Sequence, residues 1–137
     1  MMLRHLIDTD VLIEHLRGQE EAVNFLKQLA VRGSVVFYSV ISKAEIFSGI
    51  RPDEEEAVTS LFSSMGEVRV DGAVAETAGR YRKKFRPSHG LLLPDALIAA
   101  SAKKVEAALV TLNKRHYPMD DVVIHVPYSR RAGGKRR

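Results

Sequence analysis

Short apolar runs alternate with longer segments of helical periodicity along almost the whole chain. The first pattern predicts buried strands and the second predicts amphipathic helices. The predicted strands span residues 3–7, 34–38, 67–70, 108–112 and 122–126, and the predicted helices span residues 9–17, 20–32, 53–64, 73–86 and 94–105, with a further helix from Ser39 or Ser42 to about Gly49. Strands that alternate with helices indicate βαβ units, so we predict an α/β fold with helices on both faces of a central, mainly parallel sheet.

The composition is that of a soluble globular domain. With 137 residues the chain is long enough for one domain with its own core. Its apolar fraction of 45% and charged fraction of 28% are ordinary values. No apolar run is long enough to span a membrane, and the start of the chain does not resemble a secretory signal. The absence of cysteine excludes disulfides and cysteine–zinc sites. We therefore expect a cytoplasmic protein without membrane association.

The positive charge of the chain is concentrated at one end. Residues 130–137 contain five basic residues and no acid, so removing them from the net charge of +4 leaves about −1 for residues 1–129. We expect residues 1–127 to form the domain and residues 128–137 to form a disordered basic tail. Such a tail either binds RNA weakly or only aids solubility.

Three carboxylates fall where predicted strands end or neighbouring helices begin. Asp8 follows the first strand, Glu45 lies within the first two turns of the helix after the second strand, and Asp95 opens the helix before the strand at 108–112. Asn113 follows that strand directly. Because the carboxyl ends of parallel strands share one edge, these side chains can face one another. Converging carboxylates favour a bound cation, and oxygen ligands suit Mg²⁺ or Mn²⁺, which can act on a phosphodiester.

Each acid also has a purely structural explanation. Asp8 can cap the following helix, and Asp95 suits the dipole of a first helical turn. Ser42 and Glu45 match a capping box, but if the helix begins at Ser39 instead, Glu45 falls in its second turn and this explanation fails. Taken together, the structural explanations leave open why three acids lie at the same edge of the sheet.

Four stretches of the chain, in order, resemble the PIN-domain family and within it the VapC-type toxins of bacteria and archaea. These stretches are residues 6–13 (LIDTDVLI), 39–49 (SVISKAEIFSG), 93–102 (LPDALIAASA) and 109–117 (LVTLNKRHY), and their order and spacing match up to about Pro127. Each stretch is a weak signal alone, but the four in sequence are specific. The resemblance implies a PIN-like α/β/α sandwich and a Mg²⁺- or Mn²⁺-dependent endoribonuclease that hydrolyses RNA phosphodiester bonds.

The resemblance also implies roles for individual residues. Asp8, Glu45 and Asp95 match the family's catalytic acidic metal ligands. The family often has a fourth acid where this chain has Asn113, so this position would supply a neutral ligand, which puts a second metal ion in doubt. Thr111 is similar to a family hydroxyl that supports the site from its edge.

Two polar residues near these acids have less clear roles. On a helix Asp10 would point away from Asp8, so we expect it to be exposed or to support a ligand. His116 can titrate near neutral pH and is a weak candidate for a general base. Its surroundings instead predict a turn that buries Tyr117.

Residues 80–86 (RYRKKFR) form the densest basic cluster of residues 1–129. Basic and aromatic side chains together suit single-stranded RNA. Because Tyr81 and Phe85 are four residues apart, we favour packing of their rings into the core, and RNA contact for some of the cations. The candidate RNA-binding residues are Arg80, Arg82, Lys83, Lys84 and Arg86, with Thr111 at the edge of the site.

The first half of the chain has more apolar residues than one small sheet needs to cover. These residues are Leu12, Leu16, Ile46, Phe47, Ile50, Val58, Leu61 and Phe62. The family resemblance implies that nearby helices form a groove for a cognate antitoxin protein, an arginine of which enters the acidic pocket. It also implies a homodimer.

Two other functions remain open. The run from Ile7 to Val11 resembles the Asp-x-Asp strand end of haloacid dehalogenase-like phosphatases, in which Asp8 would be the nucleophile and Asp10 a general acid. The short chain argues against this function, as does the lack of a suitably spaced lysine or later acid pair. The second alternative is a non-catalytic PIN domain that binds RNA or a partner, suggested by Asn113 and the basic tail.

Overall fold

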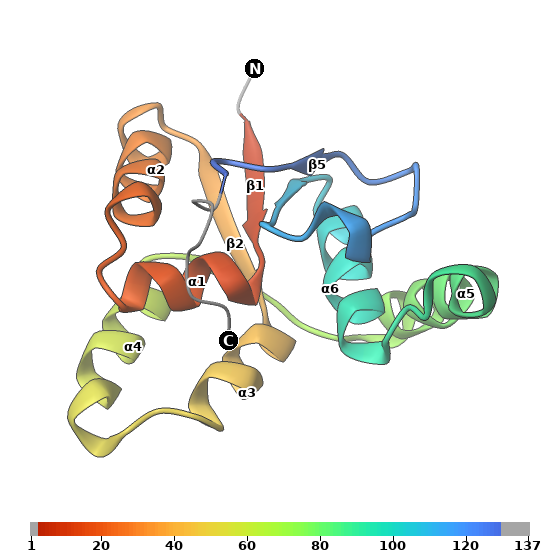
Figure 1. Cartoon of the computed structure of the whole chain (residues 1–137), viewed down its shortest axis with the longest axis horizontal. Coiled ribbons are helices and arrows are strands. Elements are labelled where there is room, and N and C mark those ends of the chain that lie inside the picture. The colour runs from red at the N-terminus through yellow and green to blue at the C-terminus, as the bar shows by residue number, and fades with distance from the viewer. Residues whose placement is uncertain (1–2, 130–137) are drawn as a thin grey trace.

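The computed structural model describes residues 3–129, which form a single five-stranded parallel sheet with helices on both faces (Figure 1). The strands are β1 (Arg4–Ile7), β2 (Val35–Ser39), β3 (Gly66–Val68), β4 (Ala108–Val110) and β5 (Ile124–His125), in the spatial order β3-β2-β1-β4-β5. The helices are α1 (Thr9–Leu16), α2 (Glu20–Val31), α3 (Val40–Phe47), α4 (Glu55–Ser63), α5 (Gly72–His89) and α6 (Leu93–Lys104), with short 3-10 helices η1 (Pro52–Glu54) and η2 (Lys114–His116). The predicted three-layer α/β/α class is confirmed, and all the strand pairs are parallel.

Two apolar cores, one on each face, hold the layers together. Successive strand residues point to opposite faces, so Leu6 packs with α5 and α6 whereas Ile7 packs with α1 to α4. Leu109 and Val110 on β4 divide in the same way. Because both faces are covered, the central strands are apolar at successive positions rather than alternating. This arrangement leaves the carboxyl edge of the sheet as the place where polar side chains collect.

Strand β4 is shorter than the sequence predicts. It ends at Val110, whereas the apolar pattern extends to residue 112. The backbone N–H of Leu112 donates to the Asp10 carboxylate at 3.0 Å, and that of Asn113 donates to the Thr111 hydroxyl at 3.1 Å. At Leu112 and Asn113, hydrogen bonds to side chains therefore replace the backbone hydrogen bonds of the sheet. The chain turns at this point, which is the edge that carries the acids.

Helix α5 is longer than predicted. It continues past the expected end near residue 86 to His89, with Pro87 in its last turn. The helix stops at Gly90, which adopts the left-handed conformation at φ 61°. The glycine is thus the actual end of the helix, and the basic cluster lies within it rather than at its end.

The chain beyond β5 returns to α1. The Tyr128 hydroxyl donates a hydrogen bond to the Glu14 carboxylate at 2.8 Å. Residues 130–137 lie outside the described residues, so the predicted disorder of the basic tail stays a prediction. No helix within residues 3–129 combines the length and apolar character that crossing a membrane requires.

Candidate active site

Asp8 directly follows β1 and is nearly buried at the carboxyl edge of the sheet, with 7% of its surface exposed. Its Oδ1 accepts a hydrogen bond from the backbone N–H of Thr9 at 2.7 Å and so caps α1. Its Oδ2 accepts hydrogen bonds from the hydroxyls of Thr111 and Tyr117, both at 2.8 Å. The capping explanation is therefore correct for one oxygen, and two buried hydroxyls hold the other in place.

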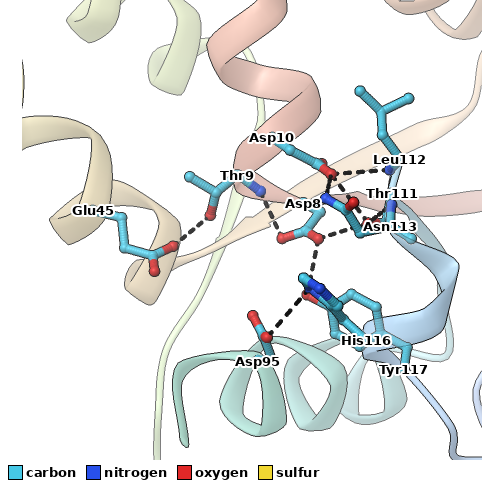
Figure 2. Close-up of polar contacts among 10 residues, drawn as sticks. All are labelled: Asp8, Thr9, Asp10, Glu45, Asp95, Thr111, Leu112, Asn113, His116 and Tyr117. Carbon is cyan, nitrogen blue, oxygen red and sulfur yellow. Dashed lines mark hydrogen bonds and ion pairs between the residues drawn. The ribbon is translucent and has the colours of Figure 1, made fainter. Parts of the chain in front are cut away.

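Asp10 lies beside Asp8, so the expectation that it points away from Asp8 is wrong (Figure 2). Its Oδ2 accepts hydrogen bonds from the backbone N–H of Leu112 at 3.0 Å and the side-chain amide of Asn113 at 2.9 Å. Asp8 is the N-cap and precedes the first helical residue, so helical spacing does not separate the two acids. Asp10 instead joins the start of α1 to the segment after β4.

The environment of Asp8 raises its pKa to about 7, chiefly through burial and then through the negative charge of Asp10. The hydrogen bonds from Tyr117, Thr111 and Thr9 lower the pKa but do not offset burial. The carboxyl group is therefore balanced between its neutral and charged forms near neutral pH. A cation bound nearby would favour the charged form.

Glu45 reaches the same edge from α3. The Ser39 hydroxyl accepts a hydrogen bond from the backbone N–H of Ile41 at 3.0 Å, so Ser39 caps the helix and Glu45 lies in its second turn. The capping-box explanation for Glu45 is therefore wrong. The Thr9 hydroxyl, directly after Asp8, donates to Glu45 Oε1 at 2.7 Å. Glu45 thus approaches the site through a residue of α1 (Figure 2).

Asp95 lies in the first turn of α6, on the other side of Asp8 from Asp10 (Figure 2). Its side chain is 24% exposed, and its Oδ2 lies 3.8 Å from Nδ1 of His116. Burial is the main cause that raises the pKa of Asp95; His116 lowers it, and the negative charges of Glu45 and Asp10 raise it. Asp95 therefore lies close enough to Glu45 and Asp10 for their negative charges to raise its pKa.

Tyr117 is the site residue that the sequence did not indicate. Its predicted burial is confirmed at 4% exposure, but its hydroxyl also donates to Asp8 and helps to lower the pKa of Asp95. Burial raises the pKa of Tyr117 well above its ordinary value, so this hydroxyl remains a donor. Because a buried tyrosine hydroxyl usually has a hydrogen-bond partner, the predicted burial of Tyr117 was the feature of the sequence that could have indicated this contact.

The oxygen-rich donor set fits a hard divalent cation. Within residues 3–129, no three acidic, histidine or cysteine side chains are already placed to hold a metal ion by themselves. Mg²⁺ does not require such a cage, because it is commonly held by one or two carboxylates, with water and phosphate oxygens completing its shell. The raised pKa values of Asp8 and Asp95 also indicate negative charges that a cation would stabilise.

The basic cluster on α5 divides between structural and exposed side chains. The Tyr81 ring is buried and the partly buried Phe85 packs against the same core, so the expected packing of the two rings against the core is confirmed. Arg80 pairs with Glu76 at 2.6 Å, and Arg82 donates to the backbone carbonyl of Leu91 at 3.2 Å. Of the five cations in this cluster, Lys83, Lys84 and Arg86 make no ion pair or backbone hydrogen bond with the described residues 3–129.

A hollow of about 560 Å³ lies between α1, α3 and α4, and Glu45 is on its wall. Four of the eight predicted groove residues line it: Leu16, Ile46, Ile50 and Val58. Leu12 and Phe62 belong to the core instead. Beside the apolar residues, the wall carries Arg17, Arg51, Asp53 and Glu54.

Comparisons with known proteins agree with this geometry. A family model described as PIN domain matches residues 5–122. Ribonuclease VapC19 of Mycobacterium tuberculosis is 37% identical over 115 residues, which cover 83% of this chain and 92% of that protein. Ribonuclease VapC10 of the same organism is 38% identical over 115 residues, covering 83% of this chain and 86% of the relative.

Solved structures share the fold over nearly the whole chain. A toxin–antitoxin complex from Klebsiella pneumoniae superimposes with a TM-score of 0.74 at 26% identity, covering 91% of this chain and 98% of that chain. DNA-bound VapBC from Salmonella typhimurium superimposes with a TM-score of 0.77 at 21% identity, covering 90% of this chain and 98% of that chain. At that identity the second likeness supports the fold alone.

Proposed function

The chain belongs to the PIN domain family, and from this premise we propose that it is a metal-dependent endoribonuclease, the toxin of a toxin–antitoxin pair. The observation that carries the proposal is the meeting of Asp8, Asp10 and Asp95 at one edge of the sheet, with Glu45 reaching that edge through Thr9. Two relatives named ribonucleases, 37% and 38% identical, support RNA as the substrate.

In this proposal Asp8, Glu45 and Asp95 hold Mg²⁺ or Mn²⁺, with Asn113 as a weaker candidate ligand. The ion would stabilise negative charge on the phosphodiester and promote ionisation of the attacking water. Thr111 and Tyr117 fix the orientation of the Asp8 carboxylate, because each donates to its Oδ2 at 2.8 Å. Asn113 donates to Asp10, so it orders the edge of the site whether or not it contacts the ion.

Cations of α5 are proposed to bind the RNA backbone. Lys83, Lys84 and Arg86 are the stronger candidates, whereas Arg80 and Arg82 already have partners in Glu76 and the Leu91 carbonyl. Helix α5 packs against α6, which carries Asp95, so RNA bound along α5 can continue toward the acids. Binding of this kind weakens steeply as the salt concentration rises.

A cognate antitoxin protein is the proposed partner. The support is the likeness to the Klebsiella pneumoniae toxin–antitoxin complex and the hollow of about 560 Å³ beside Glu45, lined by Leu16, Ile46 and Ile50. An antitoxin segment with apolar residues and a basic residue would match this lining. We also propose that the toxin is a homodimer, which sedimentation equilibrium can test.

Cleavage of a labelled single-stranded RNA by the purified chain tests the function. We expect internal cleavage with Mg²⁺ or Mn²⁺, none in EDTA, and recovery when metal is restored. Hydrolysis of p-nitrophenyl phosphate in place of RNA would instead support a phosphatase. RNA binding with no product at any Mg²⁺ or Mn²⁺ concentration would identify a non-catalytic binding domain.

Asp10→Asn separates the nuclease from the phosphatase. In the nuclease, Asp10 supports its neighbours through its bonds to Leu112 and Asn113, so we expect a loss in RNA cleavage of about 10-fold. In the phosphatase Asp10 is the general acid, and its loss should be as severe as that of Asp8. Rates of the two variants, measured side by side, decide between these functions.

Tyr117→Phe should slow RNA cleavage by about 10-fold to 100-fold, because it removes a hydroxyl that orients Asp8 and lowers its pKa. The acidic limb of the pH–rate profile should also move to higher pH. Tyr38→Phe is the matched control, since that buried hydroxyl donates to Glu67 instead. An unchanged profile for Tyr117→Phe would show that the hydroxyl does not tune the site.

A further inference from the structure

Thr9 contacts two of the proposed metal ligands through different groups. Its backbone N–H donates to Asp8 Oδ1 at 2.7 Å, and its hydroxyl donates to Glu45 Oε1, also at 2.7 Å (Figure 2). Thr9 is the first residue of α1 and directly follows Asp8, the N-cap of that helix. Glu45 lies on α3, which packs against α1. Thr9 therefore joins the proposed ligand at the end of β1 to the proposed ligand in the second turn of α3.

The bond from Thr9 is the main restraint on the Glu45 side chain. Glu45 is exposed, and within residues 3–129 its carboxylate accepts no other described hydrogen bond and forms no described ion pair. A glutamate has three side-chain torsions, and fixing them in one position costs considerable conformational entropy. Because the Thr9 hydroxyl restricts the side chain before a cation binds, part of this entropy is already lost when the ion arrives.

Ser42 fixes the direction of the Thr9 hydroxyl. Ser42 is 0% exposed, and its Oγ is hydrogen-bonded to Thr9 Oγ1 at 2.8 Å. The Thr9 hydroxyl has one proton for its two partners, and a carboxylate has none to give. Thr9 therefore donates to Glu45 and accepts from Ser42, because the opposite direction would leave two acceptors facing each other at 2.7 Å. Ser42 and Glu45 are three positions apart on α3, so both lie on the side of that helix that faces Thr9.

We propose that Thr9 is a positioning residue, whose hydroxyl, oriented by Ser42, holds Glu45 beside Asp8 in the arrangement that binds divalent metal. Thr9 acts through Glu45 and not by contacting the ion. This inference rests on the proposed function for the identity of the site, but its effect on metal binding can be measured without any cleavage.

The test compares Mn²⁺ affinity, measured by electron paramagnetic resonance of free Mn²⁺, in the full wild-type chain and in variants of it. Thr9→Val keeps the branched shape and the backbone N–H but removes the hydroxyl, and it should weaken binding by about 10-fold. Thr9→Ser keeps the hydroxyl on a side chain with a freer torsion, and it should weaken binding by no more than about 3-fold. Ser42→Ala should fall between these two, because Thr9 still donates to Glu45 but is no longer held in one direction.

A double variant separates positioning of Glu45 from a general structural role of Thr9. Glu45→Ala removes the proposed ligand, and adding Thr9→Val to it should cause no further loss of Mn²⁺ affinity, because Thr9 then has nothing to position. Thr77→Val is the matched control, since it makes the same substitution at a half-buried position of α5 and should bind Mn²⁺ as the wild-type chain does. Circular dichroism spectra verify that each variant is folded.

Four results would overturn the proposal. The first two are wild-type Mn²⁺ affinity in Thr9→Val and equal losses in Thr9→Val and Thr9→Ser. The third is a further loss when Thr9→Val is added to Glu45→Ala, which would show that Thr9 acts independently of that ligand. The fourth is no Mn²⁺ binding by the wild-type chain, which would also remove the metal site from the proposed function. If the wild-type chain binds Mn²⁺ but does not cut RNA, the proposed function fails, while the comparison of Mn²⁺ affinities still decides this inference.

Discussion

Asp8→Asn is expected to slow RNA cleavage by about 1,000-fold and to leave the fold intact. Removing the charge of a metal-binding carboxylate costs several kcal/mol of stabilisation of the transition state, and about 4 kcal/mol corresponds to this factor. The side chain keeps its shape, and the hydroxyls of Thr111 and Tyr117 can still bond to an amide group. Loss of activity should therefore occur without loss of structure.

The experiment compares single-turnover cleavage rates and circular dichroism spectra of the wild-type chain and the variant. Asp53→Asn is the matched control, because it makes the same substitution on a side chain that is 78% exposed. Wild-type cleavage by Asp8→Asn would remove Asp8 from the catalytic machinery. Unfolding of the variant would call for Asp8→Glu, which keeps the charge but moves the oxygens and should retain the fold with reduced activity.

The stability of the metal-free protein is expected to fall between about pH 4 and pH 7 because of Asp8. Its carboxyl has a pKa of about 7 in the folded chain, against an ordinary value of 3.8. The folded state therefore holds this proton over a range in which the unfolded state has released it. Stability from this group is complete below about pH 4 and is lost as the pH rises through 7, by a few kcal/mol in total.

Urea unfolding in EDTA at pH 5.5 and pH 8 measures this effect, with Asp8→Asn as the reference that lacks the titrating group. The comparison is needed because the pKa values of His5 and His15 are lowered by burial, which favours stability at higher pH and opposes the trend. Mg²⁺ should restore stability at pH 8, by about 2.7 kcal/mol at a concentration 100 times its dissociation constant. The same pH dependence in wild type and variant would contradict the raised pKa.

The alternation of strands and helices predicted the fold well because both faces of the sheet are covered. Leu6 and Ile7 are both apolar for that reason, and the pattern is typical of parallel sheets. The ends of elements were harder to predict. Strand β4 stops early because Leu112 bonds to the Asp10 side chain, a contact between segments far apart in the sequence.

The positions of three acids of the candidate site could be predicted from the sequence, whereas the residues that support them could not. Asp8 follows β1, Glu45 lies in the second turn of the helix after β2, and Asp95 lies in the first turn of α6, so the topology brings these acids to one edge. The direction of the Asp10 side chain was predicted wrongly, because the residue spacing of a helix does not apply across its N-cap. The hydroxyl of Tyr117 reaches Asp8 from more than 100 positions away, and no local pattern contains that information.

Mn²⁺ binding and RNA cleavage, followed in the same sample during a Mn²⁺ titration, test the central claim most directly. If the acids around Asp8 form the catalytic metal site, the cleavage rate should rise in proportion to bound Mn²⁺, and Asp8→Asn should lose both together. Equal cleavage in EDTA, or full Mn²⁺ binding and cleavage by Asp8→Asn, would contradict the claim.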